Sequence, residues 1–307
     1  MRIRVATRRS KLSIKQVNLV LSALKSRHPE LEAELVFVKT KGDIHADIPP
    51  TKIGSKGIFE KEVNLAVLRG EADVAVHSLK DVPSEVSEGL VLAAVLPRES
   101  PLEALVSRER LKLEELPEGA VVGTSSIRRR AALRCLRPGL EVRHLRGNVD
   151  TRIRKLQMGM YDAILVAEAG LKRLGFDNLI AQVFAPTEIT PAPCQGVIGV
   201  YAREGDGEVL GLLREVSDER TYAEAAIERE VTRRVGGGCF TPLGVCARVE
   251  GSKVTVIASL YSPTGRRKVT VVEEGDVSRR DAVVDKVSER LLREGEDVLS
   301  EARVVVE

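Results

Sequence analysis

The stretch Ala72-Asp-Val-Ala-Val-His-Ser-Leu-Lys-Asp-Val-Pro83 decides the fold. Residues 74–76 are apolar and two of them are β-branched, so the segment 73–76 predicts a short buried strand, and Pro83 prevents regular structure beyond it. Four polar side chains lie between the strand and the proline: His77, Ser78, Lys80 and Asp81. Active sites of open α/β sheets lie at strand ends of this kind, so we expect the chemistry here. An aspartate beside a lysine could also simply cap a turn.

The neighbouring segments alternate between strand and helix patterns. Strands are expected at residues 3–6 and 35–38, and a helix over 10–28 has apolar residues at helical spacing. A second alternating series runs from residue 121 to 166 between proline-rich breaks, and the apolar segment 197–201 returns to the first lobe as a strand. This order predicts two α/β lobes that are joined by two crossings.

The last part of the chain has a different order. Three strand candidates, at 243–249, 254–260 and 268–272, come before a helix over 278–293, which predicts a small α+β domain. The expected division places residues 1–97 and 196–216 in lobe one, 102–190 in lobe two and 218–307 in the C-terminal domain.

Length and composition describe an ordinary globular protein. The chain has 307 residues, of which 43% are hydrophobic and 30% charged, and no apolar run approaches the length of a membrane span. The first residues lead directly into a strand pattern and lack the plan of a secretory signal, so we expect a cytoplasmic protein. Neither a disulfide framework nor a metal site is expected from four scattered cysteines: Cys135, Cys194, Cys239 and Cys246.

The positive charge is concentrated in one segment. The whole chain has a net charge of +3, whereas residues 123–155 contain nine arginines and one lysine against two acidic residues. Gly123-Thr-Ser-Ser-Ile-Arg-Arg-Arg130 follows a strand and opens a helix, which is a natural anion site. Leu145-Arg-Gly-Asn-Val-Asp-Thr-Arg152 repeats the pattern. Together they indicate a ligand with several negative groups.

Other interpretations of these two motifs remain open. Ser126 could merely cap a surface helix whose arginines are solvated, and Arg146 and Arg152 could pair with Glu141 or Asp150. Nucleic acid would also supply negative groups. However, aromatic residues make up only 3% of the chain and Trp is absent, so a base-stacking platform is not indicated.

The setting of one cysteine suggests that its thiol is presented to another surface. Val235-Gly-Gly-Gly-Cys-Phe-Thr-Pro242 puts Cys239 on a loop of small residues that lets the backbone approach another surface closely. Cys135 is expected inside a helix and Cys246 on a strand, so both are expected in the core. The glycine-rich loop could also be a plain hairpin turn.

Five motifs taken in order resemble the porphobilinogen deaminase family, also called hydroxymethylbilane synthases. They cover essentially the whole chain: Val-His-Ser-Leu-Lys-Asp-Val-Pro at 76–83, Val-Gly-Thr-Ser-Ser-Ile-Arg-Arg at 122–129, Leu-Arg-Gly-Asn-Val-Asp-Thr-Arg at 145–152, Gly-Leu-Lys-Arg-Leu-Gly at 170–175 and Gly-Gly-Cys at 237–239. The resemblance implies two lobes like those of periplasmic binding proteins around a central cleft, plus a small C-terminal α+β domain that carries a covalent primer.

The resemblance also implies an activity and its residues. The family is a transferase of tetrapyrrole biosynthesis that joins four porphobilinogen molecules head to tail, with loss of ammonia, onto a dipyrromethane cofactor, and then releases hydroxymethylbilane by hydrolysis. By motif match, Asp81 is the catalytic carboxylate and Cys239 holds the cofactor through a thioether. The other cofactor contacts would be Ser78, Lys80, Asp81, Thr124, Ser125, Arg128, Arg129 and Arg146. The substrate contacts would be Arg8, Gln16, Arg146, Arg152 and Arg173, and the lid residues Lys52, Lys56 and Phe59.

The chain departs from the family pattern most clearly at two positions, and Ser55 and Phe240 are milder substitutions. Cys194 stands where the family usually has a glycine, and Ser100 stands where an aspartate is common.

The expected partner is porphobilinogen, without nucleic acid or membrane, and the resemblance implies a monomer. Two other classes remain as alternatives: a two-lobed protein that clamps a polycarboxylate or phosphate without reacting, and a basic RNA-binding protein.

Overall fold

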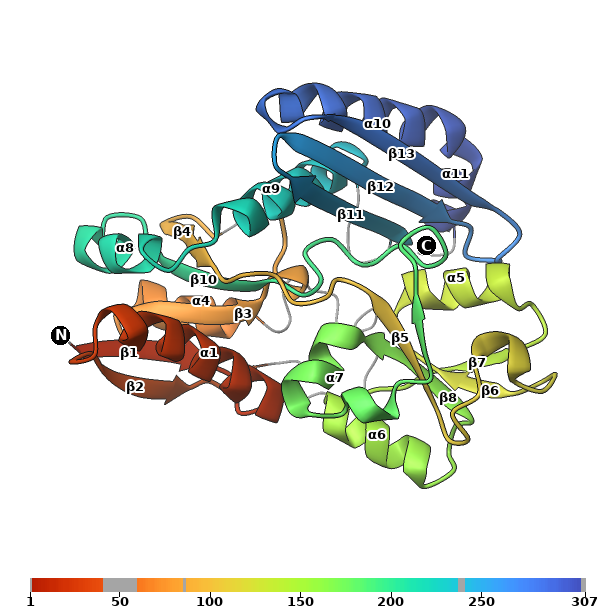
Figure 1. The fold of residues 1–307 in the computed structure, drawn as a ribbon, viewed down its shortest axis with the longest axis horizontal. Coiled ribbons are helices and arrows are strands. Elements are labelled where there is room, and N and C mark those ends of the chain that lie inside the picture. The colour runs from red at the N-terminus through yellow and green to blue at the C-terminus, as the bar shows by residue number, and fades with distance from the viewer. Residues whose placement is uncertain (1, 41–59, 85–86, 237–240, 305–307) are drawn as a thin grey trace. The chain divides into compact units, whose positions relative to one another are not determined.

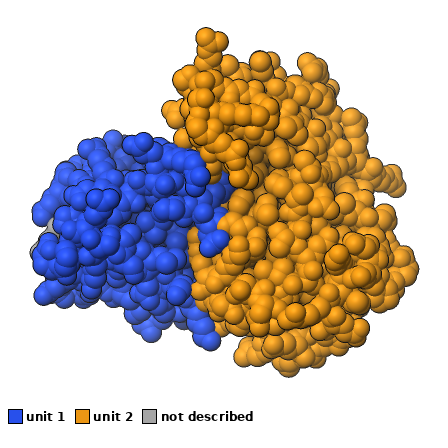
Figure 2. Space-filling view, viewed as in Figure 1, with its two compact units in different colours: residues 1–99, 196–222 blue, residues 100–195, 223–307 orange. Residues whose placement is uncertain are grey.

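The computed structural model describes residues 2–40, 60–84, 87–236 and 241–304. The chain divides into two compact units, which Figure 2 colours separately. Unit 1 contains Met1–Glu99 and Gly196–Tyr222, and unit 2 contains Ser100–Gln195 and Ala223–Glu307. Each unit has its own five-stranded sheet, and the C-terminal residues of unit 2 form a further three-stranded sheet. The predicted α/β class with a separate C-terminal α+β part is confirmed.

Unit 1 is built on a mixed sheet with the order β2-β1-β3-β10-β4 (Figure 1). Its strands are β1 (Arg2–Thr7), β2 (Glu32–Phe37), β3 (Val74–Ser78), β4 (Leu90–Val95) and β10 (Ile198–Arg203). β1 runs parallel to β2 and β3, whereas β10 is antiparallel to both β3 and β4. The central strand, β3, is therefore paired along both edges, and its residues 74–77 are buried.

Helices cover both faces of this sheet. They are α1 (Lys11–Arg27), α4 (Lys61–Leu68) and α8 (Gly207–Arg214). Val74 and Val76 share one core with the apolar residues of α1 and α8. Because side chains alternate along a strand, Ala75 and His77 point to the other face, where His77 contacts Asn64 of α4.

α1 follows from its sequence as expected. Ser10 caps the first turn by accepting a hydrogen bond from the Ser13 N–H at 3.1 Å, and the helix ends at Arg27, with His28 as its C-cap directly before a proline. Val17, Val20 and Leu24 are buried. The predicted periodicity is therefore the face that packs on the sheet.

Unit 2 begins with a second mixed sheet, whose order is β7-β6-β8-β5-β9. Its strands are β5 (Glu103–Ser107), β6 (Val121–Gly123), β7 (Glu141–Arg143), β8 (Ala163–Ala167) and β9 (Gln182–Phe184). Its helices are α5 (Ile127–Leu136), α6 (Val149–Gln157) and α7 (Glu168–Leu174). α5 packs into one core, and α6 and α7 pack into another, so both faces of the sheet are covered.

The C-terminal sheet has the order β11-β12-β13 and is antiparallel throughout. Its elements are α9 (Glu219–Arg234), β11 (Leu243–Glu250), β12 (Lys253–Tyr261), β13 (Lys268–Asp276), α10 (Arg280–Glu294) and α11 (Glu296–Val304). Apolar residues of the strands and of α9, α10 and α11 form one core. Short 3₁₀ turns complete the described elements: η1 (Leu79–Asp81), η2 (Leu113–Glu115), η3 (Asp177–Leu179) and η4 (Val277–Arg279). No helix in the described ranges is both long and apolar enough to cross a membrane.

The sequence patterns missed three strands, β4, β5 and β9. β5 pairs antiparallel with β8 and β9, and β4 pairs antiparallel with β10, so none of them belongs to a strand–helix–strand repeat. The alternation of strand and helix patterns along the sequence therefore does not predict these three strands. The central strand also extends two residues further than predicted, through Ser78.

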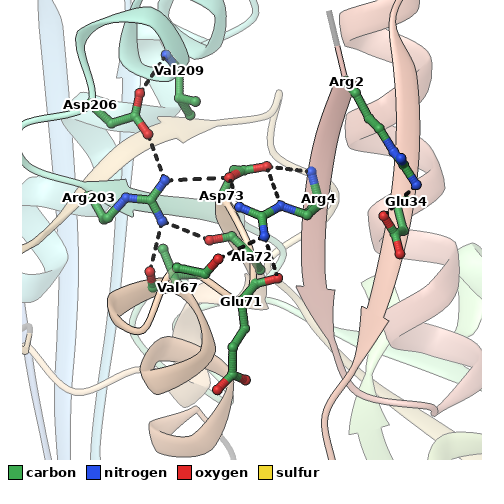
Figure 3. Close-up of polar contacts among 11 residues, drawn as sticks. Arg2, Arg4, Glu34, Val67, Glu71, Ala72, Asp73, Arg203, Asp206 and Val209 are labelled. Atoms are coloured by element: carbon green, nitrogen blue, oxygen red, sulfur yellow. Dashed lines mark hydrogen bonds and ion pairs between the residues drawn. The ribbon is translucent and has the colours of Figure 1, made fainter.

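An ion network fixes the beginning of β3 (Figure 3). The Asp73 carboxylate accepts hydrogen bonds from the Arg4 backbone N–H at 2.8 Å and from Arg4 Nη2 at 2.7 Å. Arg203 Nη2 lies 3.5 Å from the same carboxylate and 2.8 Å from Asp206. Arg203 also donates to the carbonyl of Val67 at 2.8 Å, and so this network ties β1, β3 and β10 to the end of α4 and the start of α8.

The Asp73 pKa reflects this network. Burial by itself raises the pKa of the Asp73 carboxyl, but hydrogen bonds and charge from Arg4 outweigh burial, so the pKa lies below its usual value. A carboxyl group with a lowered pKa stabilises the fold above the pKa it has in the unfolded chain, which is about 4. This stabilisation is lost as the pH falls through the lowered pKa.

We predict that Asp73→Asn destabilises the protein by about 2 kcal/mol at pH 7, because it leaves the Arg4 and Arg203 guanidinium groups without their shared counter-ion. The difference from the wild type should shrink as the pH falls from about 4 through the lowered Asp73 pKa. Urea unfolding at several pH values measures both effects.

Glu34→Gln is the matched control, because it removes the exposed pair in which Arg2 and Glu34 lie 2.7 Å apart. It should change the stability by about 0.5 kcal/mol or less. Equal losses in the two variants would contradict a special role of the Asp73 network.

Candidate functional site

Polar residues gather at the carboxyl ends of β1 and β3 in unit 1. Gln16, which is buried in the second turn of α1, donates to the Ser78 hydroxyl at 2.7 Å, so two residues predicted from sequence are in contact. Arg8 follows β1 directly, and its positive charge acts on His77 of β3. The parallel pairing of β1 with β3 therefore brings Arg8, Gln16 and Ser78 to one edge of the sheet.

Asp81 lies on a short turn that a buried leucine anchors. Leu79 is fully buried, and its N–H donates to the Val197 carbonyl at 3.0 Å, while the Val82 N–H closes the turn onto Leu79 O at 3.1 Å. Asp81 is exposed and Lys80 is half-buried. The turn thus holds the backbone in place and leaves the Asp81 carboxylate accessible to a ligand.

His77 is not available as a base at this edge. Burial, and secondly the charge of Arg8, lower the pKa of His77 to about 3. The ring is neutral because of this low pKa, and its Nε2 lies 2.9 Å from Asn64 Oδ1 on α4, to which it donates a hydrogen bond. His77 therefore positions β3 against α4, and Asp81 is the exposed acidic group of this turn.

In unit 2, the hydroxyls of the first basic motif organise the ends of β6 and β7. Ser126 caps α5 by accepting from the Arg129 N–H at 3.3 Å. Ser125 donates to the Leu145 carbonyl at 2.7 Å, and the buried Thr124 accepts from the Ser126 N–H at 3.3 Å. The prediction that Thr124 and Ser125 contact a cofactor stays a prediction.

Arg128 and Arg129 have an internal partner that the sequence analysis missed. Both are 6% exposed and form ion pairs with the fully buried Glu103, where Arg129 Nε lies 2.8 Å from the carboxylate. Arg128 Nη1 also donates to the Thr190 carbonyl at 2.6 Å, and Arg129 Nη2 to Gln195 at 3.4 Å. The one available signal was a single acidic residue directly before an apolar run, Glu103-Ala-Leu-Val. The expected ligand contacts of these two arginines stay predictions.

The second basic motif forms the loop between β7 and α6. Gly147 adopts a φ of 111°, which favours glycine, and its carbonyl accepts from Arg152 Nε at 2.8 Å. Glu141 pairs with Arg143, with Nε and Oε1 2.7 Å apart, and this carboxylate is therefore already engaged on its own strand. Arg146 is half-buried in this loop, and Arg173 is half-buried on α7.

Four predicted residues lie outside the described ranges: Lys52, Lys56, Phe59 and Cys239. The other three cysteines are free thiols, and Cys194 and Cys246 are buried. Within the described ranges, no group of three or more His, Cys, Asp or Glu side chains could hold a metal ion.

We predict that Glu103→Gln destabilises the protein by about 3 to 5 kcal/mol, because it leaves two buried guanidinium groups without their carboxylate. Glu103→Asp keeps the charge and should lose much less. The urea midpoint of unfolding measures both. Glu141→Gln, which breaks an exposed pair with Arg143, is the control and should cost about 0.5 kcal/mol or less. A midpoint for Glu103→Gln equal to that of the control would show that the buried pair is dispensable.

Two family models match the chain. "Porphobilinogen deaminase, dipyromethane cofactor binding domain" matches residues 3–211, and "Porphobilinogen deaminase, C-terminal domain" matches residues 222–293. Together they span most of both units.

Curated relatives agree with the family models. A probable porphobilinogen deaminase of Hyperthermus butylicus is 54% identical over 278 residues, which cover 90% of this chain and 91% of that protein. A second probable porphobilinogen deaminase, of Pyrobaculum calidifontis, is 49% identical over 301 residues. The match covers 96% of this chain and 100% of that protein. Among solved structures, the methionine-binding protein MetQ resembles the chain with a TM-score of 0.43 and 14% identity, over 74% of this chain and 94% of that one.

Proposed function

This chain belongs to the porphobilinogen deaminase family, and from that premise we propose that Asp81 is its catalytic carboxylate and Cys239 its cofactor attachment residue. The resemblance inferred from the motifs is confirmed by the family models and the relatives. The enzyme is a transferase that joins four porphobilinogen molecules head to tail onto a dipyrromethane cofactor and then releases hydroxymethylbilane by hydrolysis, a step of tetrapyrrole biosynthesis.

The basic residues of unit 2 fit such a cofactor. Each pyrrole ring of a dipyrromethane carries an acetate and a propionate, and guanidinium groups are the side chains best shaped to hold carboxylates. The segment 123–155 has nine arginines, and Glu141, one of its two acidic residues, is already paired with Arg143. The proposed cofactor contacts are Ser78, Lys80, Asp81, Thr124, Ser125, Arg128, Arg129 and Arg146. Bound through a cysteine thioether, the cofactor supplies the pyrrole end that the first substrate extends.

The exposure of Asp81 carries the proposal for the catalytic residue. Its carboxylate is accessible to solvent, while Leu79 and the pairing of β3 hold the backbone beneath it. From this position Asp81 can accept hydrogen bonds from pyrrole N–H groups and stabilise the positive charge that develops as ammonia leaves. It can also take up the proton that is released when two rings join.

The remaining proposed residues bind and shield the substrate. We place porphobilinogen carboxylates at Arg8, Gln16, Arg146, Arg152 and Arg173. Lys52, Lys56 and Phe59 would act as a lid that excludes water. The proposed domains are lobe one (1–97 and 196–216), lobe two (102–190) and a cofactor-attachment domain (218–307).

We also propose that the enzyme acts as a monomer in the cytoplasm. The three described cysteines are free thiols, as is usual in a reducing compartment. The exposed large apolar residues of the described ranges are distributed over both units, from Leu19 and Phe37 to Val272 and Leu292. Light scattering should therefore give a mass near 33.5 kDa, and twice that mass would contradict the monomer.

The mass of the purified protein tests the attachment residue. The wild type should exceed its sequence mass by one dipyrromethane, and Cys239→Ser should lack the added mass and be inactive, because a hydroxyl is a much weaker nucleophile than a thiolate. Added mass on Cys239→Ser would place the attachment elsewhere. An unmodified wild-type Cys239 with reversible ligand release would indicate a binding protein.

Asp81→Ala serves as the complementary variant in the same experiment. It should keep the added mass, because the thiol is intact, but lose turnover by about 100-fold or more, because the charge stabilisation is removed. Full activity of Asp81→Ala would reject its catalytic role.

A further inference from the structure

Within the part of the chain that the structure describes, Arg130 of α5 forms no ion pair with an acidic side chain. It is half-buried, and its Nε atom is buried and has no hydrogen-bond partner among the described residues. Burial, and secondly the charge of Arg134, lower the pKa of Arg130. Hydrogen-bonded carboxylates have the opposite effect elsewhere, and raise the pKa of Arg4 and Arg143. Arg130 is therefore an incompletely solvated cation, and such groups are stabilised by binding an anion.

His144 stands next to Arg130 at the end of β7. Arg130 Nη2 lies 3.3 Å from His144 Nδ1, and the imidazole is exposed. Burial of part of the ring and the charges of Arg130 and Arg146 lower the pKa of His144. Arg130 and His144 thus lie together where β7 ends. The positive charge of Arg146, in the loop that follows, acts on the same imidazole.

The nearby acidic groups are already engaged. Glu141 is paired with Arg143 on the same strand at 2.7 Å. Asp162, which precedes β8, accepts from the Val121 N–H at 2.8 Å and from Arg108 at 3.3 Å. Tyr161 donates its hydroxyl proton to the His144 carbonyl at 2.6 Å, which fixes the backbone under the ring. Arg134 is directed to the Pro263 carbonyl at 2.7 Å. These contacts leave Arg130 and His144 as donors for an external anion.

We propose that Arg130 and His144 form a carboxylate-binding position, next to Arg146, for a side-chain carboxylate of the growing polypyrrole. The inference rests on the proposed function, because it assigns one further contact to the same ligand. A carboxylate at this position accepts a hydrogen bond from the Arg130 guanidinium and one from the imidazole. His144 takes up a proton on binding, because the negative charge favours its charged form.

Steady-state kinetics with porphobilinogen test the contact. In Arg130→Gln and in His144→Gln, KM should rise about tenfold with kcat changed less than about twofold, because a contact kept in both ground and transition states affects binding alone. Arg154→Gln is the matched control, since it removes the same charge from an exposed position of α6. Its KM should stay within about twofold of the wild type.

A second readout does not depend on turnover. The chain has four histidines, so imidazole NMR signals can be resolved, and His144→Gln assigns one of them. The titration midpoint of His144 should rise by about one pH unit when the cofactor-bearing enzyme is loaded with porphobilinogen, and should rise less in Arg130→Gln. The signal of the half-buried His28 in unit 1, whose Nε2 lies 3.0 Å from Glu215, serves as the internal reference. A structural role of His144 would leave its midpoint unchanged by loading.

The outcomes separate this inference from the proposed function. Normal wild-type mass and turnover together with an unchanged KM in Arg130→Gln, or an unmoved His144 midpoint, overturn this inference alone. A wild type without the added mass or turnover overturns the proposed function and this inference with it. An equal shift of His144 on addition of inorganic phosphate to the unloaded enzyme identifies a general anion site and overturns the assignment to a chain carboxylate.

Discussion

The carboxylate of Asp73, shared by Arg4 and Arg203, is the interaction on which the architecture of unit 1 depends. Arg4 comes from β1 and Arg203 from β10, which are the two strands that flank β3. Both guanidinium groups also bind carbonyls at the end of α4, so one network sets the strand order and the start of β3 together. A strand rises about 3.3 Å per residue, so fixing Asp73 also fixes where Ser78 and the turn with Asp81 lie. The ion network at one end of the strand thereby positions Ser78 and Asp81, two residues of the proposed site, at the other.

Unit 2 uses a buried carboxylate in a second way. Glu103 neutralises part of the charge of Arg128 and Arg129, although it lies outside the basic segment in sequence. A count of charges along residues 123–155 therefore overstates the charge that faces a ligand. The arginines of this segment divide into two groups: those paired with a carboxylate of the chain, such as Arg129 and Arg143, and those without an acidic partner among the described residues, such as Arg130. Under the proposed function, the second group adds uncompensated positive charge to the field that a polycarboxylate meets.

Local sequence patterns predicted helices and central strands, but they did not predict contacts between distant parts of the chain. The extent of α1 follows from a local pattern, because a helical period depends on neighbouring residues, whereas Gln16 was identified only by the motif resemblance. β4, β5 and Glu103 were missed, because antiparallel pairing and ion pairs depend on residues far away in sequence. Motif resemblance supplied the chemistry of Asp81, whereas its exposure on a turn anchored by Leu79 comes only from the structure.

Cys194 illustrates how the fold accommodates a departure from the family pattern. Its φ of 60° lies in the left-handed region, where a side chain costs about 1 to 2 kcal/mol and where glycine is usual. The fold offsets this cost locally. The Cys194 N–H donates to Glu228 Oε2 at 2.5 Å, and the other oxygen of this buried carboxylate accepts from the Ala247 N–H at 2.7 Å. Cys194 is 1% exposed, and its thiol lies 3.7 Å from the Ala225 carbonyl. A carboxylate on α9 thus joins the segment before β10 to β11, and the backbone conformation that glycine would adopt freely is held here by hydrogen bonds and packing.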